Sequence, residues 1–136
     1  MVEVVNRQRR LRLDTEAWSN FASRALKAIG NDGASAIVAF VSDRRMRELN
    51  RSFRGIDRAT DVLSFPTGDE DRLNLGDIAV SVDTAAVQAK ENGLSFDDEI
   101  AQLILHGLLH LSGYDHEADD GEMNRLELRL RRKLKI

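Results

Sequence analysis

Three histidines lie close together in the chain and have the spacing of metal ligands. They are His106, His110 and His116, and the sequence contains no other histidine. His106 and His110 are four residues apart, so on a helix both imidazoles project from one face and can reach the same ion. Gly113 can adopt the left-handed conformation that ends a helix, which would bring His116 round as the third ligand. The spacing therefore predicts a metal site made of three neutral ring nitrogens.

The expected metal is a single Zn²⁺ ion with one open coordination position. The chain has no cysteine, so the ligands must be nitrogen or oxygen atoms. Three protein ligands leave the fourth tetrahedral position to water, as in catalytic zinc sites, where the pKa of that water falls to about 7. Nickel, copper and iron also accept histidine ligands. Three unrelated core histidines are the competing interpretation, which is disfavoured because buried imidazoles need partners and one shared cation satisfies all three.

The histidine spacing also allows a different hydrolase. The pattern H-x3-H-x2-G-x2-H occurs in metzincin proteases, so a metal-dependent amide or peptide hydrolase is an alternative. Those proteases use a glutamate directly after the first histidine as general base, whereas this chain has Gly107 there. Asp115 adjoins His116 and could orient a ligand or move a proton in catalysis, although a turn aspartate is an equally good interpretation.

The hydrophobic pattern places these residues in a single α+β domain. Short apolar or β-branched runs predict strands at residues 3–5, 10–13, 34–41, 62–65 and 78–82, with an exposed loop at 67–74. Helical spacing and cap residues predict helices at residues 14–30, 42–55, 83–93, 95–111 and 117–134. The helix that carries His106 and His110 is apolar nearly all round, which is typical of a central, buried helix. We expect one domain, residues 1–136, with a small mixed sheet of about four strands covered by helices.

Length and composition indicate a soluble, cytoplasmic protein. With 136 residues, 42% hydrophobic and 32% charged, the chain can bury a core without disulfides. The sequence lacks a signal-peptide pattern and any apolar stretch of membrane-spanning length, so we expect no membrane partner. The net charge of −3 does not indicate a nucleic-acid-binding protein, but six arginines cluster in one segment. A solvated helix face is the first interpretation of this cluster: Arg44, Arg45, Arg47, Arg51, Arg54 and Arg58.

Four segments of the chain, taken in order, carry a family resemblance. They are residues 49–55 (LNRSFRG), 60–66 (TDVLSFP), 75–78 (LGDI) and 106–116 (HGLLHLSGYDH). Together they resemble the YbeY family of bacterial rRNA-maturation endoribonucleases over nearly the whole chain. The resemblance implies a small α+β domain with zinc at the three histidines. It also implies a metal-dependent endoribonuclease that is specific for single-stranded RNA and acts in rRNA 3′-end processing and ribosome quality control.

The resemblance adds one catalytic residue and a set of partners. The family's functional arginine is matched by Arg54, whose guanidinium could bind a phosphate bidentately and stabilise charge on a phosphorane. The surrounding arginines would then attract the RNA backbone, with an affinity that falls as salt rises. The implied partners are single-stranded RNA or rRNA and the small ribosomal subunit with its associated proteins, and no DNA specificity is expected.

Aromatic residues near the expected site have two interpretations. Phe53, Phe65 and Tyr114 could stack on unpaired bases. Phenylalanine at helical or strand spacing is more often part of the core, and Phe53 falls on the same helix face as Met46 and Leu49.

A third functional alternative keeps the metal but removes catalysis. The chain could be a ribosome-assembly factor in which the metal only stabilises the C-terminal part of the fold, because the binding energy of a structural metal is folding energy. Replacing His110 would then lower stability and RNA affinity without removing any turnover.

Overall fold

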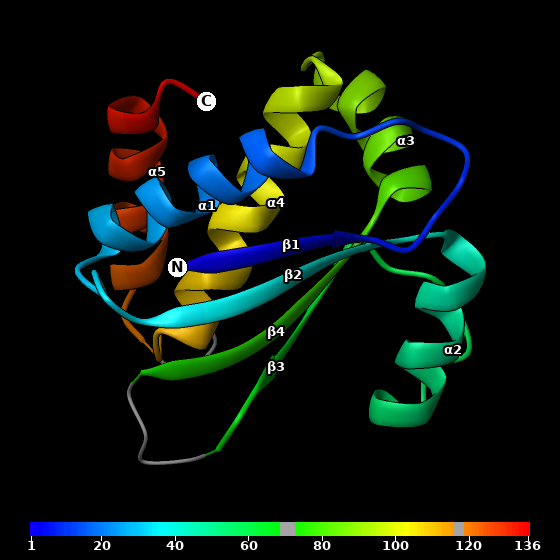
Figure 1. The fold of residues 1–136 in the computed structure, drawn as a ribbon, viewed down its shortest axis with the longest axis horizontal. Helices are drawn as coiled ribbons and strands as arrows, with labels where there is room; N and C mark the ends of the chain where they lie inside the picture. Colours follow the sequence, from blue (N-terminus) through cyan, green and yellow to red (C-terminus); the bar gives the residue numbers. More distant parts are fainter. Residues whose placement is uncertain (69–72, 116–118) are drawn as a thin grey trace.

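The computed structural model describes residues 1–68, 73–115 and 119–136. Within these ranges the chain forms five helices and four strands (Figure 1). In chain order they are β1 (Val2–Asn6), α1 (Thr15–Ile29), β2 (Ser35–Val41), α2 (Asp43–Arg54), β3 (Val62–Pro66), β4 (Asn74–Ser81), α3 (Val82–Asn92), α4 (Phe96–Leu111) and α5 (Glu122–Leu134).

The four strands form one mixed sheet in the order β1-β2-β4-β3. β1 pairs with β2 and β2 with β4 in parallel, whereas β3 runs antiparallel to β4 and forms one edge. Gly76 of β4 makes the close approach of β3 possible, because its φ is +131° and a Cβ atom there would lie 2.2 Å from the carbonyl oxygen of Phe65. The expectation of an α+β fold with a small mixed sheet is confirmed.

Helices α1, α3, α4 and α5 lie on one side of the sheet (Figure 1). The main core forms there, where Val38, Phe40, Ile78 and Val80 of the sheet cluster with the leucines and isoleucines of α4. The predicted central position of the histidine-bearing helix is correct. On the other side, α2 is the one helix among the described residues that covers the sheet, and its Met46 joins a small second cluster with Val41, Leu63 and Ala79. Much of this second face therefore has no helix over it in the described ranges, and Ile37 of β2 is 39% exposed.

Local signals predicted most helix ends correctly. The side chain of Asp14 accepts a hydrogen bond from the backbone N–H of Ala17 at the start of α1, and Ser42 does the same for Arg45 at the start of α2. Gly30 and Gly55 end these two helices with φ angles of 107° and 71°.

The predicted strand at residues 10–13 is wrong. Gln8, which is 8% exposed, holds this segment as a loop: its Oε1 accepts from the backbone N–H groups of Arg10 and Leu11, and its Nε2 donates to the carbonyl oxygen of Leu11. These bonds occupy backbone groups that a strand would use in a ladder.

Other boundaries, at both ends of β4 and at the start of the last helix, also differ from the prediction. β4 begins at Asn74 and ends at Ser81, whose side chain accepts from the N–H of Thr84 as the cap of α3, so Val82 belongs to the helix rather than to the strand. The last helix begins at Glu122 instead of residue 117, because Asp119 accepts from the N–H groups of Gly121 and Met123 and holds a turn ahead of the helix. Residues 116–118, and 69–72 of the expected loop, lie outside the described residues.

Candidate metal centre

Helix α4 brings His106 and His110 together as the sequence predicted. Their rings meet in a T-shaped, edge-to-face arrangement, with centroids 4.6 Å apart and an angle of 79° between the ring planes. The two Nε2 atoms are 3.1 Å apart. His116, the third predicted ligand, lies outside the described residues, and within the described ranges no group of three metal-binding side chains is complete.

Each of the two rings has a hydrogen-bond partner at Nδ1. This partner determines which ring nitrogen remains available to bind a metal. Nδ1 of His106 donates to Oε1 of Glu127 at 2.9 Å, and Nδ1 of His110 donates to the carbonyl oxygen of Tyr114 at 3.0 Å. A carboxylate and a carbonyl can only accept, so each ring carries its proton on Nδ1. In the neutral form of each ring, the unprotonated nitrogen is then Nε2, and the two Nε2 atoms face each other.

The two Nε2 atoms are placed so that both could bind one cation. When both rings are neutral, two lone pairs 3.1 Å apart repel each other unless a shared proton or a metal ion lies between them. Two nitrogen ligands at about 2.0–2.1 Å from one tetrahedral zinc ion are separated by roughly 3.3 Å, which is close to the observed distance. The neutral imidazoles and their Nδ1 partners are also the donor chemistry that zinc prefers.

Glu127 is a site residue that the sequence analysis missed. It lies on α5, is 8% exposed, and has an Arg131 guanidinium nitrogen 3.8 Å from Oε1. Burial raises the pKa of Glu127, but the hydrogen bond from His106 and the positive charge of Arg131, together with that of either imidazole whenever it is protonated, outweigh it, so the pKa lies below its usual value. One sequence feature could have indicated Glu127: it is a charged residue on the same helix face as the packing residues Met123, Leu126 and Leu130.

A cleft of about 540 Å³ opens in front of the two histidines. Arg54, the last residue of α2, and Asp115, just after Tyr114, both line it and are exposed. The structure thus brings both predicted catalytic residues to the same cleft as His106 and His110. Strand β3 forms another part of the lining, and its Ser64 hydroxyl donates to the carbonyl oxygen of Gly107 at 3.4 Å.

Asp61 is a second carboxylate of this cleft, and the sequence analysis gave it no role. It directly precedes β3, and its Oδ1 accepts from the backbone N–H of Val62 at 2.7 Å and from the hydroxyl of Thr60 at 3.4 Å. No spacing signal connects Asp61 with the histidines, because they are far apart in the chain and meet only through the packing of α4 on β3.

Comparison with known proteins decides the family. A family model described as Endoribonuclease YbeY matches residues 3–135. The chain belongs to the YbeY family. The Endoribonuclease YbeY of Koribacter versatilis is 50% identical over 121 residues, which are 89% of this chain and 78% of that protein. The Endoribonuclease YbeY of Geobacter metallireducens is 40% identical over 136 residues, covering 96% of this chain and 91% of the relative.

A solved structure supports the fold of this YbeY family member. The solution structure of TM1509 from Thermotoga maritima superposes with a TM-score of 0.70 at 29% sequence identity, covering 98% of this chain and 89% of the other. The resemblance inferred from the four sequence segments is therefore confirmed at the level of family and fold. In the described ranges, no helix combines the length and apolar character that crossing a membrane requires.

Gly107, where the proteases carry their glutamate, has a packing role in this member of the YbeY family. A Cβ atom at this position would lie 3.0 Å from both Cδ1 and Cγ2 of Ile78. Helix α4 therefore approaches β4 so closely that residue 107 points at the sheet. A glutamate would be directed into the core, which gives a physical reason against the peptidase alternative.

The arginine cluster is partly neutralised by acidic neighbours. Arg47 donates two hydrogen bonds to Asp57, at 2.8 and 3.1 Å, and Arg51 lies 3.9 Å from the same carboxylate. The hydrogen bond from Arg47 is the main reason that the pKa of Asp57 lies below its usual value. Arg45 pairs with Glu48 at 3.0 Å. In contrast, Arg54 forms no ion pair with any described residue.

The aromatic residues do not all lie where the sequence placed them. The expectation that Phe53 faces inward is wrong, because its side chain is 67% exposed at the end of α2. Phe65 is half-buried, and its ring centroid lies 5.0 Å from that of Phe53. Tyr114 is half-buried against the main core and also lines the cleft.

Proposed function

We propose that this chain is a zinc-dependent endoribonuclease, residues 1–136 forming one catalytic domain that cleaves single-stranded RNA. The observation that carries the proposal is the meeting of two Nε2 atoms, from His106 and His110, with the exposed guanidinium of Arg54 in one cleft. Membership of the YbeY family, and relatives that are named as endoribonucleases, support RNA as the substrate.

The histidines, Arg54 and the carboxylates at the cleft have proposed tasks. His106, His110 and His116 would hold the metal, which would act as a Lewis acid toward the phosphoryl oxygen and lower the pKa of water. Arg54 binds the scissile phosphate and stabilises the charge that develops on it. Asp115 is the proposed proton-transfer group, with Asp61 as the other carboxylate of the same cleft.

The proposed biological role is rRNA 3′-end maturation and ribosome quality control in the cytoplasm. The partners would be single-stranded rRNA and the small ribosomal subunit with its associated proteins, without specificity for DNA. The family resemblance and the endoribonuclease name of the relatives support this role.

Cleavage of a labelled single-stranded RNA by the metal-quantified protein tests the proposal. The expected result is cleavage that stops on chelation and is lost in folded His110→Ala and Arg54→Ala variants. Cleavage at the wild-type rate by both variants would identify the activity as contamination and overturn the proposal.

One observation favours the assembly-factor alternative enough to keep it in the test. The hydrogen bond between His106 and Glu127 joins α4 to α5, so a metal at this place would also stabilise the C-terminal helix. Under that alternative, the metal-loaded wild type shows no cleavage, and His110→Ala lowers thermal stability and RNA affinity only.

A further inference from the structure

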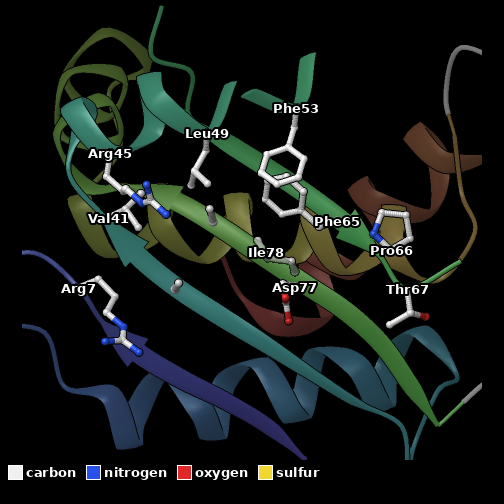
Figure 2. A pocket seen from close by; sticks show the side chains of 12 residues that line it. Arg7, Val41, Arg45, Leu49, Phe53, Phe65, Pro66, Thr67, Asp77 and Ile78 are labelled. Atoms are coloured by element: carbon white, nitrogen blue, oxygen red, sulfur yellow. The ribbon is translucent and has the colours of Figure 1, made fainter. Parts of the chain in front are cut away.

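A groove of about 860 Å³ lies on the sheet face opposite α4, between α2 and the strands (Figure 2). Its floor is formed by small side chains, Ala39 of β2 and Ala79 of β4. Leu49 and Phe53 of α2 and Phe65 of β3 form its apolar walls. This groove is separate from the histidine cleft, which lies on the other side of β3.

Two aromatic rings at this groove are available to a ligand. Phe53 is 67% exposed, although folding usually removes a side chain of this size from water. Its ring meets that of Phe65 edge to face, with centroids 5.0 Å apart and planes at 63° (Figure 2). An edge-to-face pair leaves part of each ring face open, and a ring face is the surface on which an unpaired base stacks.

Charged groups at the groove fit a nucleotide chain. Arg7 and Arg45, both exposed, lie at one end of it, and Pro66 and Thr67 lie at the other (Figure 2). Guanidinium groups bind phosphates, and Arg7 has no ion-pair partner in the described part of the chain. Asp77 at the floor would repel a phosphate but can accept hydrogen bonds from the amino groups of bases.

The groove and the cleft are separate, but they border each other at the edge of the sheet. Phe53 and Arg54 are neighbours at the end of α2, and Phe53 lines the groove whereas Arg54 lines the cleft. Pro66 of β3 lines both. Because β3 is the edge strand, a chain that leaves Arg54 can pass over it without crossing another strand.

We infer that this groove binds unpaired bases of the RNA strand whose scissile phosphate lies at Arg54, with Phe53 and Phe65 as the stacking residues. The inference rests on the proposed endoribonuclease function and extends it, because it assigns the basis of single-strand preference. A duplex cannot offer its base faces to the two rings, whereas a single strand can.

Fluorescence anisotropy with a labelled, 2′-O-methylated single-stranded RNA tests the groove, with a gel to verify that the probe stays intact. Phe53→Ala should weaken binding about tenfold, since loss of one base stack typically costs that much or more. Phe53→Tyr, which keeps the ring, should bind within about twofold of wild type. Val87→Ala is the matched control, because it removes an apolar side chain that is 57% exposed on α3, and it should bind as wild type does.

The outcomes separate this inference from the proposed function. Wild-type affinity in Phe53→Ala, equal losses in the Ala and Tyr variants, or no binding by the wild type would each overturn the groove as a base-binding site. A protein or a second copy of the chain would then be the occupant of the groove. If RNA cleavage stops on chelation while Phe53→Ala binds normally, only the groove inference fails. If binding depends on the Phe53 ring but no RNA is cleaved, only the proposed catalytic function fails.

Discussion

The carboxylate of Glu127, on the last helix, accepts a hydrogen bond of 2.9 Å from Nδ1 of His106, which lies 21 residues earlier on α4. This bond fixes the tautomer of His106 and keeps Nε2 directed at Nε2 of His110. Arg131, one turn further along α5, lies 3.8 Å from the same carboxylate and contributes to holding it ionised.

Glu127→Ala should therefore weaken metal binding about tenfold to a hundredfold, the usual effect of removing the partner of a histidine ligand. Zinc affinity measured by competition with a chromophoric chelator gives this value without reference to activity. Glu122→Ala, at an exposed position of the same helix, is the control and should keep wild-type affinity. Equal affinities in all three proteins would show that Glu127 does not position a metal ligand.

The variant Gly107→Glu tests whether the packing of α4 on β4 excludes a glutamate at the position where the proteases carry their general base. The new side chain would be directed at Ile78, where even a Cβ atom comes within 3.0 Å, and its carboxylate would lose its hydration. We expect a fall of several degrees or more in the melting temperature and no hydrolysis of peptides. Asn124→Glu places the same residue at an exposed position of α5 and should leave the melting temperature nearly unchanged. A stable Gly107→Glu variant that hydrolyses peptides would reinstate the peptidase alternative.

The sequence predicted what depends on local chemistry and missed what depends on the packing of distant segments. The caps Asp14 and Ser42 act within three residues of themselves, so their signals are readable in the chain. The contact between His106 and Glu127 depends on how two helices are placed against each other, which no local pattern contains.

Periodicity also failed where a helix extends beyond the surface that it covers. Phe53 shares its helix face with Met46, which is fully buried, but at the end of α2 a groove lies between the helix and the sheet, and Phe53 lines it. The inward face of a helix is buried only as far as another element lies beneath it. The same limit explains why the groove could not be seen in the sequence.

Asp61→Asn and Asp115→Asn compare the two carboxylates of the cleft. The one that transfers a proton should lose about a hundredfold or more in kcat when it becomes an amide, because an amide cannot exchange the proton at neutral pH. The other variant should lose much less. The comparison needs the pH profile of kcat for both variants, since loss of the group also removes one limb of the profile. Full activity in both variants would show that neither carboxylate moves the proton.

Removal of the metal should lower the stability of the fold as well as its activity. A metal that binds only the native chain stabilises it by about 2.7 kcal/mol at a hundred times its dissociation constant. Scanning calorimetry before and after chelation should therefore show a loss of several degrees, restored by added zinc. His110→Ala should show a low melting temperature that zinc no longer raises. A melting temperature that is unchanged by chelation in the wild type would contradict a metal site at this place.

Two variants of Arg54 separate the contribution of its positive charge to phosphate binding from that of its hydrogen-bond geometry. Arg54→Ala should lower kcat/KM for RNA by about a hundredfold, the scale of losing one donor aimed at the charge of a transition state. Arg54→Lys should recover only part of this loss, because an ammonium group keeps the charge but not the planar pair of donors. The side chain is exposed and forms no ion pair among the described residues, so both variants should fold normally. Arg132→Ala, which removes an exposed arginine of α5, should leave kcat/KM unchanged. If the Lys variant matches wild type, Arg54 acts only as a positive charge, and bidentate binding of the phosphate is ruled out.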